Sequence, residues 1–187
     1  MTDPAAEQLA QVVLNGLIAG KPVEIDGLGT FYPDTTKLFR FEPRRMAKVF
    51  IAYVVEDWRE AERLYDALEA AGFAPWIDRR KLLPGQNWPR AIENAIDTSD
   101  FFIACFSERS VAKKGGFQSE IRYALDCARQ LPLDDIFVVP VRLGSCKVPR
   151  TIQKQYQYLD LLPNFEAGVA KLVGTLRKEV ERRRSAR

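Results

Sequence analysis

The sequence predicts an α/β fold, in which a doubly wound, five-stranded parallel sheet follows a small α+β segment. From residue 48 onward, short apolar runs alternate with amphipathic stretches, a pattern typical of βαβ units with buried parallel strands. The 187 residues suffice for one such domain plus an appendage, but not for two full-sized domains. We therefore expect a small segment over residues 1–46 and a main domain over residues 47–187, ending in a basic helix.

The five strands are predicted from short apolar runs that are rich in β-branched and aromatic residues. In chain order they cover residues 48–55, 73–77, 100–106, 136–141 and 158–161. The first run is apolar along nearly its whole length, so we expect this strand at the centre of the sheet, buried on both faces.

The helices of the main domain are predicted from apolar stripes at helical spacing. Asp57 stands three positions before Glu60, the spacing of a capping box, and Pro89 falls in a first turn, where a missing N–H costs little. Asn164 precedes the last stripe as a helix cap. The predicted helices cover residues 57–71, 88–96, 117–128 and 165–180, with a loop over 78–87.

Composition and missing motifs exclude several classes of function. Histidine is absent, which removes Ser-His-Asp triads, Cys-His dyads and histidine-bound metals. The three cysteines form no C-x-x-C pair, so neither a disulfide framework nor a metal site is expected. Gly27-Leu28-Gly29 lacks the third glycine of a dinucleotide fingerprint, and no P-loop motif occurs. Without a basic leader or a long apolar run, we expect a cytoplasmic protein with no membrane partner.

The net charge of +3 is unevenly distributed along the chain. Residues 171–187 carry seven basic and two acidic side chains, whereas residues 1–47 and 48–170 each have a net charge of −1. The run Arg182-Arg183-Arg184 could meet nucleic acid or an acidic membrane. Basic ends of terminal helices are also commonly solvated and favoured by the helix dipole, which is the reading we prefer.

Several motifs of the main domain occur together in a fixed order. Phe50–Asp57 resembles F-I-S-Y-x-x-x-D, and residues 92–100 resemble I-x-x-A-I-x-x-S-D. Between them, residues 75–78 and 82–88 are similar to the second strand and the following long loop of the same fold family. The end of that family's third strand is similar to residues 105–107 with Ser110. Its next helix, which carries a glutamate, is similar to residues 117–121. From about Lys48 to Leu161 the chain resembles a TIR (Toll/interleukin-1 receptor) domain of the bacterial NAD-cleaving type, which implies a flavodoxin-like sheet.

The resemblance implies an enzyme for which NAD+ is the substrate and no separate cofactor is needed. It would be a glycohydrolase or cyclase that breaks the nicotinamide–ribose bond, acting in bacterial immune defence and dependent on self-assembly. Because the leaving group is already cationic, one carboxylate that stabilises the ribosyl cation suffices, whereas ordinary glycosidases need two. Glu120 is the implied catalytic residue, at the border of an apolar helical face. The helix dipole is expected to keep it ionised, although a glutamate near a helix start is also common for stability alone.

Several of the other implied site residues have a structural alternative. Tyr53 could belong to the core, Asp57 could cap a helix, the basic run could be solvated, and Trp88 could anchor the core. Many NAD-cleaving relatives have an aromatic residue four positions before the glutamate, where this chain has Gly116. Phe117 is adjacent, but its ring would point about 100° away. The implied substrate-binding residues are Tyr53, Asp57, Arg79, Arg80, Lys81, Trp88, Ser107 and Phe117.

A second hypothesis is a scaffold without catalytic activity that recruits other TIR domains. Leu82, Leu83, Pro84 and Gly85 lie in the long loop, where exposed leucines favour contact between copies. Self-association is therefore expected under both hypotheses, with a sensor protein as a further candidate partner. A measured turnover of NAD+ distinguishes the two.

The first 46 residues resemble a truncated HU-type DNA-binding protein. Leu9–Leu17 is predicted to be helical, and Gly20–Phe31 and Phe39–Pro43 are similar to two segments of that family. The long basic arm that enters the minor groove is replaced by a short hairpin, and the segment is slightly acidic. We therefore expect dimerisation or docking rather than DNA binding.

Overall fold

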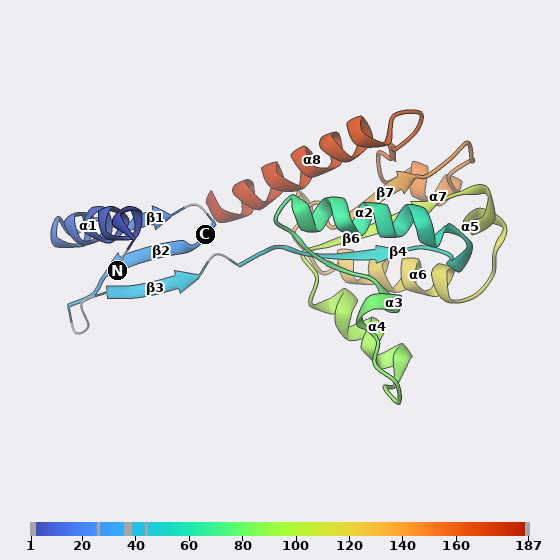
Figure 1. Ribbon diagram of the computed structural model, residues 1–187. Helices are drawn as coiled ribbons and strands as arrows, with labels where there is room; N and C mark the ends of the chain where they lie inside the picture. The colour runs from blue at the N-terminus through green and yellow to red at the C-terminus, as the bar shows by residue number, and fades with distance from the viewer. Residues whose placement is uncertain (1–2, 26, 36–38, 44, 186–187) are drawn as a thin grey trace. The chain divides into compact units, whose positions relative to one another are not determined.

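The computed structural model describes residues 3–25, 27–35, 39–43 and 45–185 (Figure 1). The chain divides into two compact units, Met1–Met46 and Ala47–Arg187. Among the described residues, no helix combines the length and the apolar character needed to cross a bilayer.

The described part of the N-terminal unit contains the helix α1 (Pro4–Ile18) and an antiparallel sheet of β1 (Val23–Ile25), β2 (Gly29–Pro33) and β3 (Phe39–Pro43). The Ala5 N–H donates to the Asp3 carboxylate at 3.0 Å, so the helix starts at Pro4, five residues before the predicted start. The strands pair in the order β1-β2-β3. Residues 36–38, part of the predicted hairpin, lie outside the described residues.

The second unit contains the predicted parallel sheet of five strands, in the order β5-β4-β6-β7-β8. β4 ends at Ala52, three residues earlier than predicted, because the chain turns through a 3₁₀ segment at Val55–Asp57. From β4 the chain runs to the edge strand β5 and then returns to β6 on the other side. This reversal creates a switch point between β4 and β6, where open α/β sheets hold ligands. The five strands are β4 (Lys48–Ala52), β5 (Ala74–Trp76), β6 (Phe101–Phe106), β7 (Val138–Arg142) and β8 (Leu159–Asp160).

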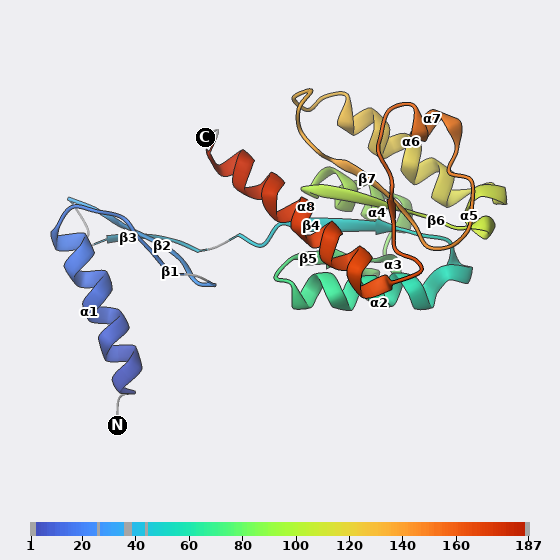
Figure 2. The ribbon, with the colours of Figure 1, turned by 90° about the horizontal axis from the view of Figure 1, so that it is seen from above.

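Helices cover both faces of this sheet, and Figure 2 shows α2 (Trp58–Ala70) and α6 (Gly116–Ala128) on opposite sides. Alternate residues of β4 enter different cores. Val49 and Ile51 pack with α2 and with α8 (Phe165–Ser185), while Phe50 and Ala52 pack with α6 and with α4 (Trp88–Asp97). Both faces of the central strand are therefore buried, as its continuous apolar run predicts.

Three short helices were absent from the sequence prediction: α3 (Asp78–Lys81), α5 (Glu108–Ala112) and α7 (Arg150–Gln153). Each is only one turn long, too short to show an apolar period. At the start of α5, Ser107 and Ser110 form a capping box in which each hydroxyl accepts the other residue's N–H. The predicted loop over 78–87 is thus partly helical.

Two of the three arginines at the basic end of α8, Arg182 and Arg183, are engaged within the protein, which corrects the expectation of a solvated tail for these two residues. The buried Glu179 carboxylate accepts hydrogen bonds from Arg182 at 2.7 Å and Arg183 at 2.9 Å, and from the Ile136 N–H at 3.2 Å. Arg182 also pairs with Asp135 at 2.5 Å. These bonds, first the one from Arg182, lower the pKa of Glu179 to about 2. Arg182 and Arg183 therefore hold the helix to the start of β7.

Glu179→Gln is expected to lower the free energy of unfolding by about 1–3 kcal/mol at pH 7. A lowered pKa stabilises the fold above the ordinary carboxyl pKa, and this stability is lost as the pH falls through about 2. The difference between wild type and variant, measured by urea unfolding, should shrink between pH 4.5 and pH 2. Glu181→Gln, an exposed position on the same helix, serves as the control. Equal stability of Glu179→Gln and wild type at pH 7 would contradict this account.

Candidate functional site

Three polar side chains interact beyond the carboxyl ends of β4 and β5. Tyr53 follows β4, Asp78 is the first residue of α3 after β5, and Glu120 lies on α6. The Tyr53 hydroxyl donates to the Asp78 carboxylate at 2.6 Å. The charge of Asp78 raises the pKa of Glu120, and the charge of Glu120 contributes to the raised pKa of Tyr53. We call these residues the Tyr53–Asp78–Glu120 cluster.

Glu120 is half-buried at the edge of the apolar face of α6. Its neighbours on that face, Phe117, Ile121 and Ala124, are buried. Burial, and then the charge of Asp78, raise the pKa of Glu120 to about 7. The expectation that the helix dipole keeps Glu120 fully ionised is therefore wrong. Glu120 is the fifth residue of α6, and the dipole acts mainly within the first turn, so desolvation prevails.

Tyr53 is half-buried, with its ring 5.9 Å from that of Trp58. Burial, and then the hydrogen bond to Asp78, raise its pKa, so the phenol stays protonated at neutral pH. Tyr53 is thus a hydrogen-bond donor fixed on Asp78 rather than a fully buried core residue.

Asp57 and Ser107 are buried and bonded to each other, since the Ser107 hydroxyl donates to the Asp57 carboxylate. Arg109 donates to the same carboxylate at 3.2 Å and to the Glu56 carbonyl at 2.9 Å. Asp57 stands at the N-cap position of α2, but its side chain makes no capping bond to that helix. The pair instead ties the segment after β4 to the segment after β6, on the two sides of the switch point.

The three cations of α3 face different neighbours. Arg79 lies over the Trp58 ring, 5.0 Å from its centroid, and its charge acts on Tyr53. Arg80 pairs with Asp66 at 2.7 Å and with Glu62 at 2.8 Å, both on α2. Lys81 lies over Tyr65, also on α2, at 5.9 Å. The run is therefore not simply solvated, and within it only Arg79 interacts with the cluster.

Trp88 and Phe117, two aromatic residues predicted to bind the substrate, differ in their exposure to solvent. Trp88 is 59% exposed at the start of α4, so it does not anchor the core. Phe117 is buried edge-on against Phe106, with centroids 5.8 Å apart, and does not replace the missing aromatic residue before Glu120. A Cβ added at Gly116 would meet Glu120 Oε1 at 4.0 Å and no other atom within that distance outside the nearby helix backbone.

The loop after α3 presents one large apolar side chain to solvent. Leu82 is half-buried, whereas Leu83 is 70% exposed and Pro84 is exposed. Gly85 turns the chain with a positive φ of 81°, which favours glycine. Leu83 is thus the residue of this loop best suited to contact another molecule.

The described residues give little support to metal-dependent or thiol-based catalysis. No group of three or more acidic or cysteine side chains is arranged to hold a metal ion there. Burial raises the pKa of Cys105 and, together with a bond to Asp97, that of Cys127 to about 11. These thiols stay protonated at neutral pH and are poor nucleophiles.

Sequence reasoning missed Asp78 and Arg109. Asp78 carries a signal that could have identified it, because it is a carboxylate placed directly after a predicted strand. Arg109 carries no such signal, since it bonds to residues more than 50 positions away.

The comparisons with known proteins concern the second unit. The uncharacterized protein y4cD of Sinorhizobium fredii is 26% identical over 112 residues, which cover 60% of this chain but only 17% of that protein. The TIR domain of the Toll-related receptor TRR-2 from Hydra magnipapillata aligns with a TM-score of 0.54 and 23% identity, covering 67% of this chain and 96% of that one. A metazoan TIR-STING receptor from C. gigas aligns with a TM-score of 0.58 and 25% identity, covering 67% of this chain and 38% of that one. At such identities the structural likeness supports the fold alone. Residues 49–173 match the family model of the TIR domain, and the chain therefore belongs to the TIR domain family.

Proposed function

We propose that this TIR domain cleaves NAD+ at the bond between nicotinamide and ribose. The observation that carries the proposal is the half-buried carboxyl group of Glu120, which has a pKa of about 7 and lies beside the Tyr53–Asp78 pair. Perturbed carboxyl groups at the carboxyl ends of parallel strands are typical of catalytic sites. The products are nicotinamide and either ADP-ribose or a cyclic form of it, in a reaction that serves bacterial immune defence.

The reaction needs one anion close to the breaking bond. When the C1′–N bond breaks, its electron pair leaves with nicotinamide, which becomes neutral, and the ribose carries the positive charge. Ionised Glu120 stabilises that cation in a site partly removed from water, where electrostatic interactions are strong. Water then attacks C1′ and releases a proton, which a carboxylate with a pKa near 7 is suited to accept. An adenine nitrogen in place of water gives the cyclic product.

The neighbouring residues support this role in different ways. Tyr53 and Asp78 hold one another and set the charge around Glu120. Arg79 supplies a cation beside the cluster for the diphosphate of NAD+. The Asp57–Ser107 bond fixes the backbone on both sides of the switch point, which makes these two residues positioning residues.

A scaffold without catalytic activity is the second candidate function. It is favoured by the exposure of Leu83 and by Gly116, which leaves the position before Glu120 without a ring. TIR domains commonly self-associate, so contact through this loop is compatible with both candidates. The release of nicotinamide from NAD+ by the assembled protein tests the first candidate against the second.

The rate of NAD+ cleavage is expected to rise with pH around the Glu120 pKa of about 7, because only the ionised carboxylate stabilises the ribosyl cation. Asp78→Asn removes one of the two causes of the raised pKa and should move the midpoint of kcat/KM to lower pH. Profiles of kcat/KM from pH 5.5 to 9 measure this shift independently of any loss in absolute rate. Asp126→Asn, an exposed position at the far end of α6, should leave the midpoint unchanged. An unchanged midpoint in Asp78→Asn would show that Asp78 does not act on Glu120.

A further inference from the structure

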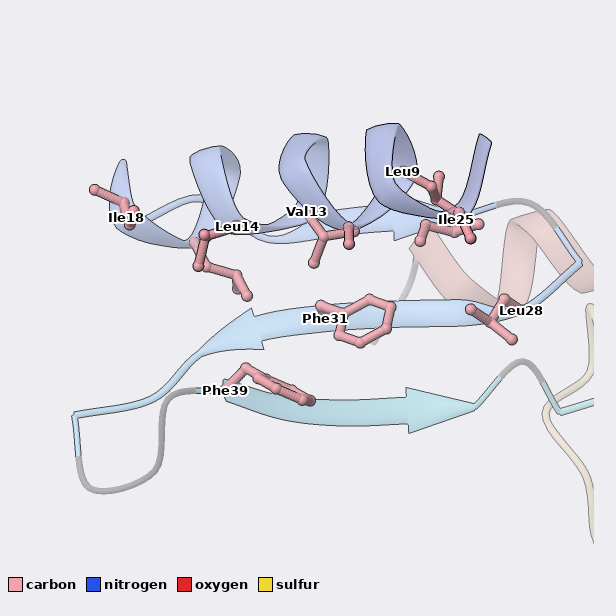
Figure 3. Close-up of a pocket in the computed structure, with 11 residues that line it drawn as sticks. Leu9, Val13, Leu14, Ile18, Ile25, Leu28, Phe31 and Phe39 are labelled. Carbon is pink, nitrogen blue, oxygen red and sulfur yellow. The ribbon is translucent and has the colours of Figure 1, made fainter. Parts of the chain in front are cut away.

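An apolar groove of about 540 Å³ lies in the N-terminal unit, between α1 and the sheet (Figure 3). Every described side chain that lines it is apolar. Figure 3 shows Val13 and Leu14 of α1 above the groove, with Phe31 of β2 and Phe39 of β3 below.

α1 has a wider apolar surface than its own sheet covers. At about 100° per residue, its apolar side chains span about 240° of the circumference, from Val12 to Ile18, whereas one-sided packing needs little more than about 100°. The helix approaches the sheet near Gly16, where an added Cβ would lie 2.1 Å from Val23 Cγ2. Leu14 and Ile18 lie on the other side of the apolar surface and remain 40% and 77% exposed.

The unit lacks a core of its own. Val13 and Gly29 are the only buried residues among those described in it. Units of about 40 residues usually need a disulfide, a metal or a partner to be stable. None of the three cysteines lies in this unit, so it has no disulfide of its own, and the chain has no histidine that could bind a metal. A partner is therefore the remaining source of stability.

The exposed apolar area is close to that of a stable interface. Eight of the described large apolar side chains of this unit are exposed, and the exposed parts of the seven other than Met46 add up to about three and a half whole side chains, or roughly 600 Å². A stable complex buries roughly 800 Å² on each partner. Leu17 and the partly exposed alanines along the groove add further apolar area, which makes up part of the difference between these two values.

We infer that the groove is covered by the same unit of a second copy of this chain. α1 carries a single charged side chain, Glu7, which by the same spacing lies between Leu14 and Ile18, and none of the described residues that line the groove is charged. Two such surfaces can face one another across a two-fold axis with only this one charge of α1 on each copy, and permanent homodimer interfaces are similarly apolar. A nucleic acid or a charged peptide would find no ion to pair with among the described residues of the groove. The dimer also keeps two TIR domains tethered, which raises the effective concentration for contacts between them.

The test is the mass of the full-length chain in solution, measured by sedimentation equilibrium from about 1 to about 100 µM. Wild type should reach at least twice the chain mass of 21.3 kDa, and Leu83→Asp, which weakens contacts between TIR domains, should approach twice that mass. Ile18→Lys places a charge on a side chain that is 77% exposed, so the fold of one copy tolerates it, while the dimer should weaken at least tenfold. Leu14→Lys should weaken it further. Gln8→Lys puts the same charge on the polar side of α1 and should leave the dimer intact.

Two outcomes would overturn the inference. The first is a wild-type chain that stays at 21.3 kDa throughout this range, which would leave the groove to another occupant. The second is an Ile18→Lys variant that dimerises as well as wild type. Because Leu83 lies in the other unit, Leu83→Asp should keep this dimer, and its loss in that variant would also count against the inference. None of these measurements depends on turnover of NAD+, so the inference and the proposed activity can fail separately.

Discussion

Glu120→Gln is expected to lower NAD+ turnover by about 10²–10³-fold, because a neutral amide cannot stabilise the ribosyl cation. The substitution preserves shape and removes only the charge. Release of nicotinamide from saturating NAD+ measures the effect. Glu108→Gln, an exposed position on the short helix α5, should retain the wild-type rate. Wild-type turnover by Glu120→Gln would remove Glu120 from the mechanism.

The same variant should be more stable than wild type at high pH. Because the folded-state pKa of Glu120 is raised to about 7, its protonated carboxyl group stabilises the fold fully below the ordinary carboxyl pKa. This contribution to the free energy of unfolding is lost as the pH rises through 7. Glutamine avoids that loss, so Glu120→Gln should gain about 1–3 kcal/mol at pH 8 and little at pH 5. Thermal unfolding at the two pH values, read by circular dichroism, measures the difference. A variant that is less stable than wild type at pH 8 would mean that Glu120 is ionised at no cost in the folded protein.

Leu83→Asp is expected to lower turnover at least tenfold and to weaken contacts between TIR domains. A leucine that is 70% exposed beside a Pro84-Gly85 turn loses water when a second domain packs on it, whereas an aspartate would be buried without a partner. The specific activity of wild type should therefore rise with enzyme concentration, and that of the variant should rise much less. Assays over a hundredfold range of enzyme concentration measure both slopes.

Leu133→Asp is the matched control for this prediction. Leu133 is a fully exposed leucine in the connection between α6 and β7, far along the chain from the Leu83 loop. The change should leave the concentration dependence as it is in wild type. A wild-type rate strictly proportional to enzyme over the whole range would contradict the role of assembly.

Most of the fold could be predicted because its signals are local. The apolar run of residues 48–52 and the stripe from Phe117 to Ala128 each identify an element and the face that it buries. The helices of one turn could not be predicted, since four or five residues show no period. The end of β4 at Ala52 was missed for a related reason: Val54 and Val55 are apolar, but they form the turn after the strand.

The site was only partly predictable because its contacts join distant segments. The position of Glu120 at the border of a helical face follows from the spacing of its apolar neighbours. Its raised pKa depends on burial and on the proximity of Asp78, 42 positions earlier in the chain, and neither the burial nor this proximity can be read from the sequence. Arg79 and Arg80 are equivalent in sequence, yet one interacts with the cluster and the other with α2.

The most direct test of the account is to incubate the purified full-length protein with NAD+ at high protein concentration and to identify the products by chromatography and mass spectrometry. We expect nicotinamide together with an equal amount of ADP-ribose or its cyclic form, and neither product from Glu120→Gln. The absence of nicotinamide from wild-type protein that is fully assembled would contradict the account and would favour the scaffold.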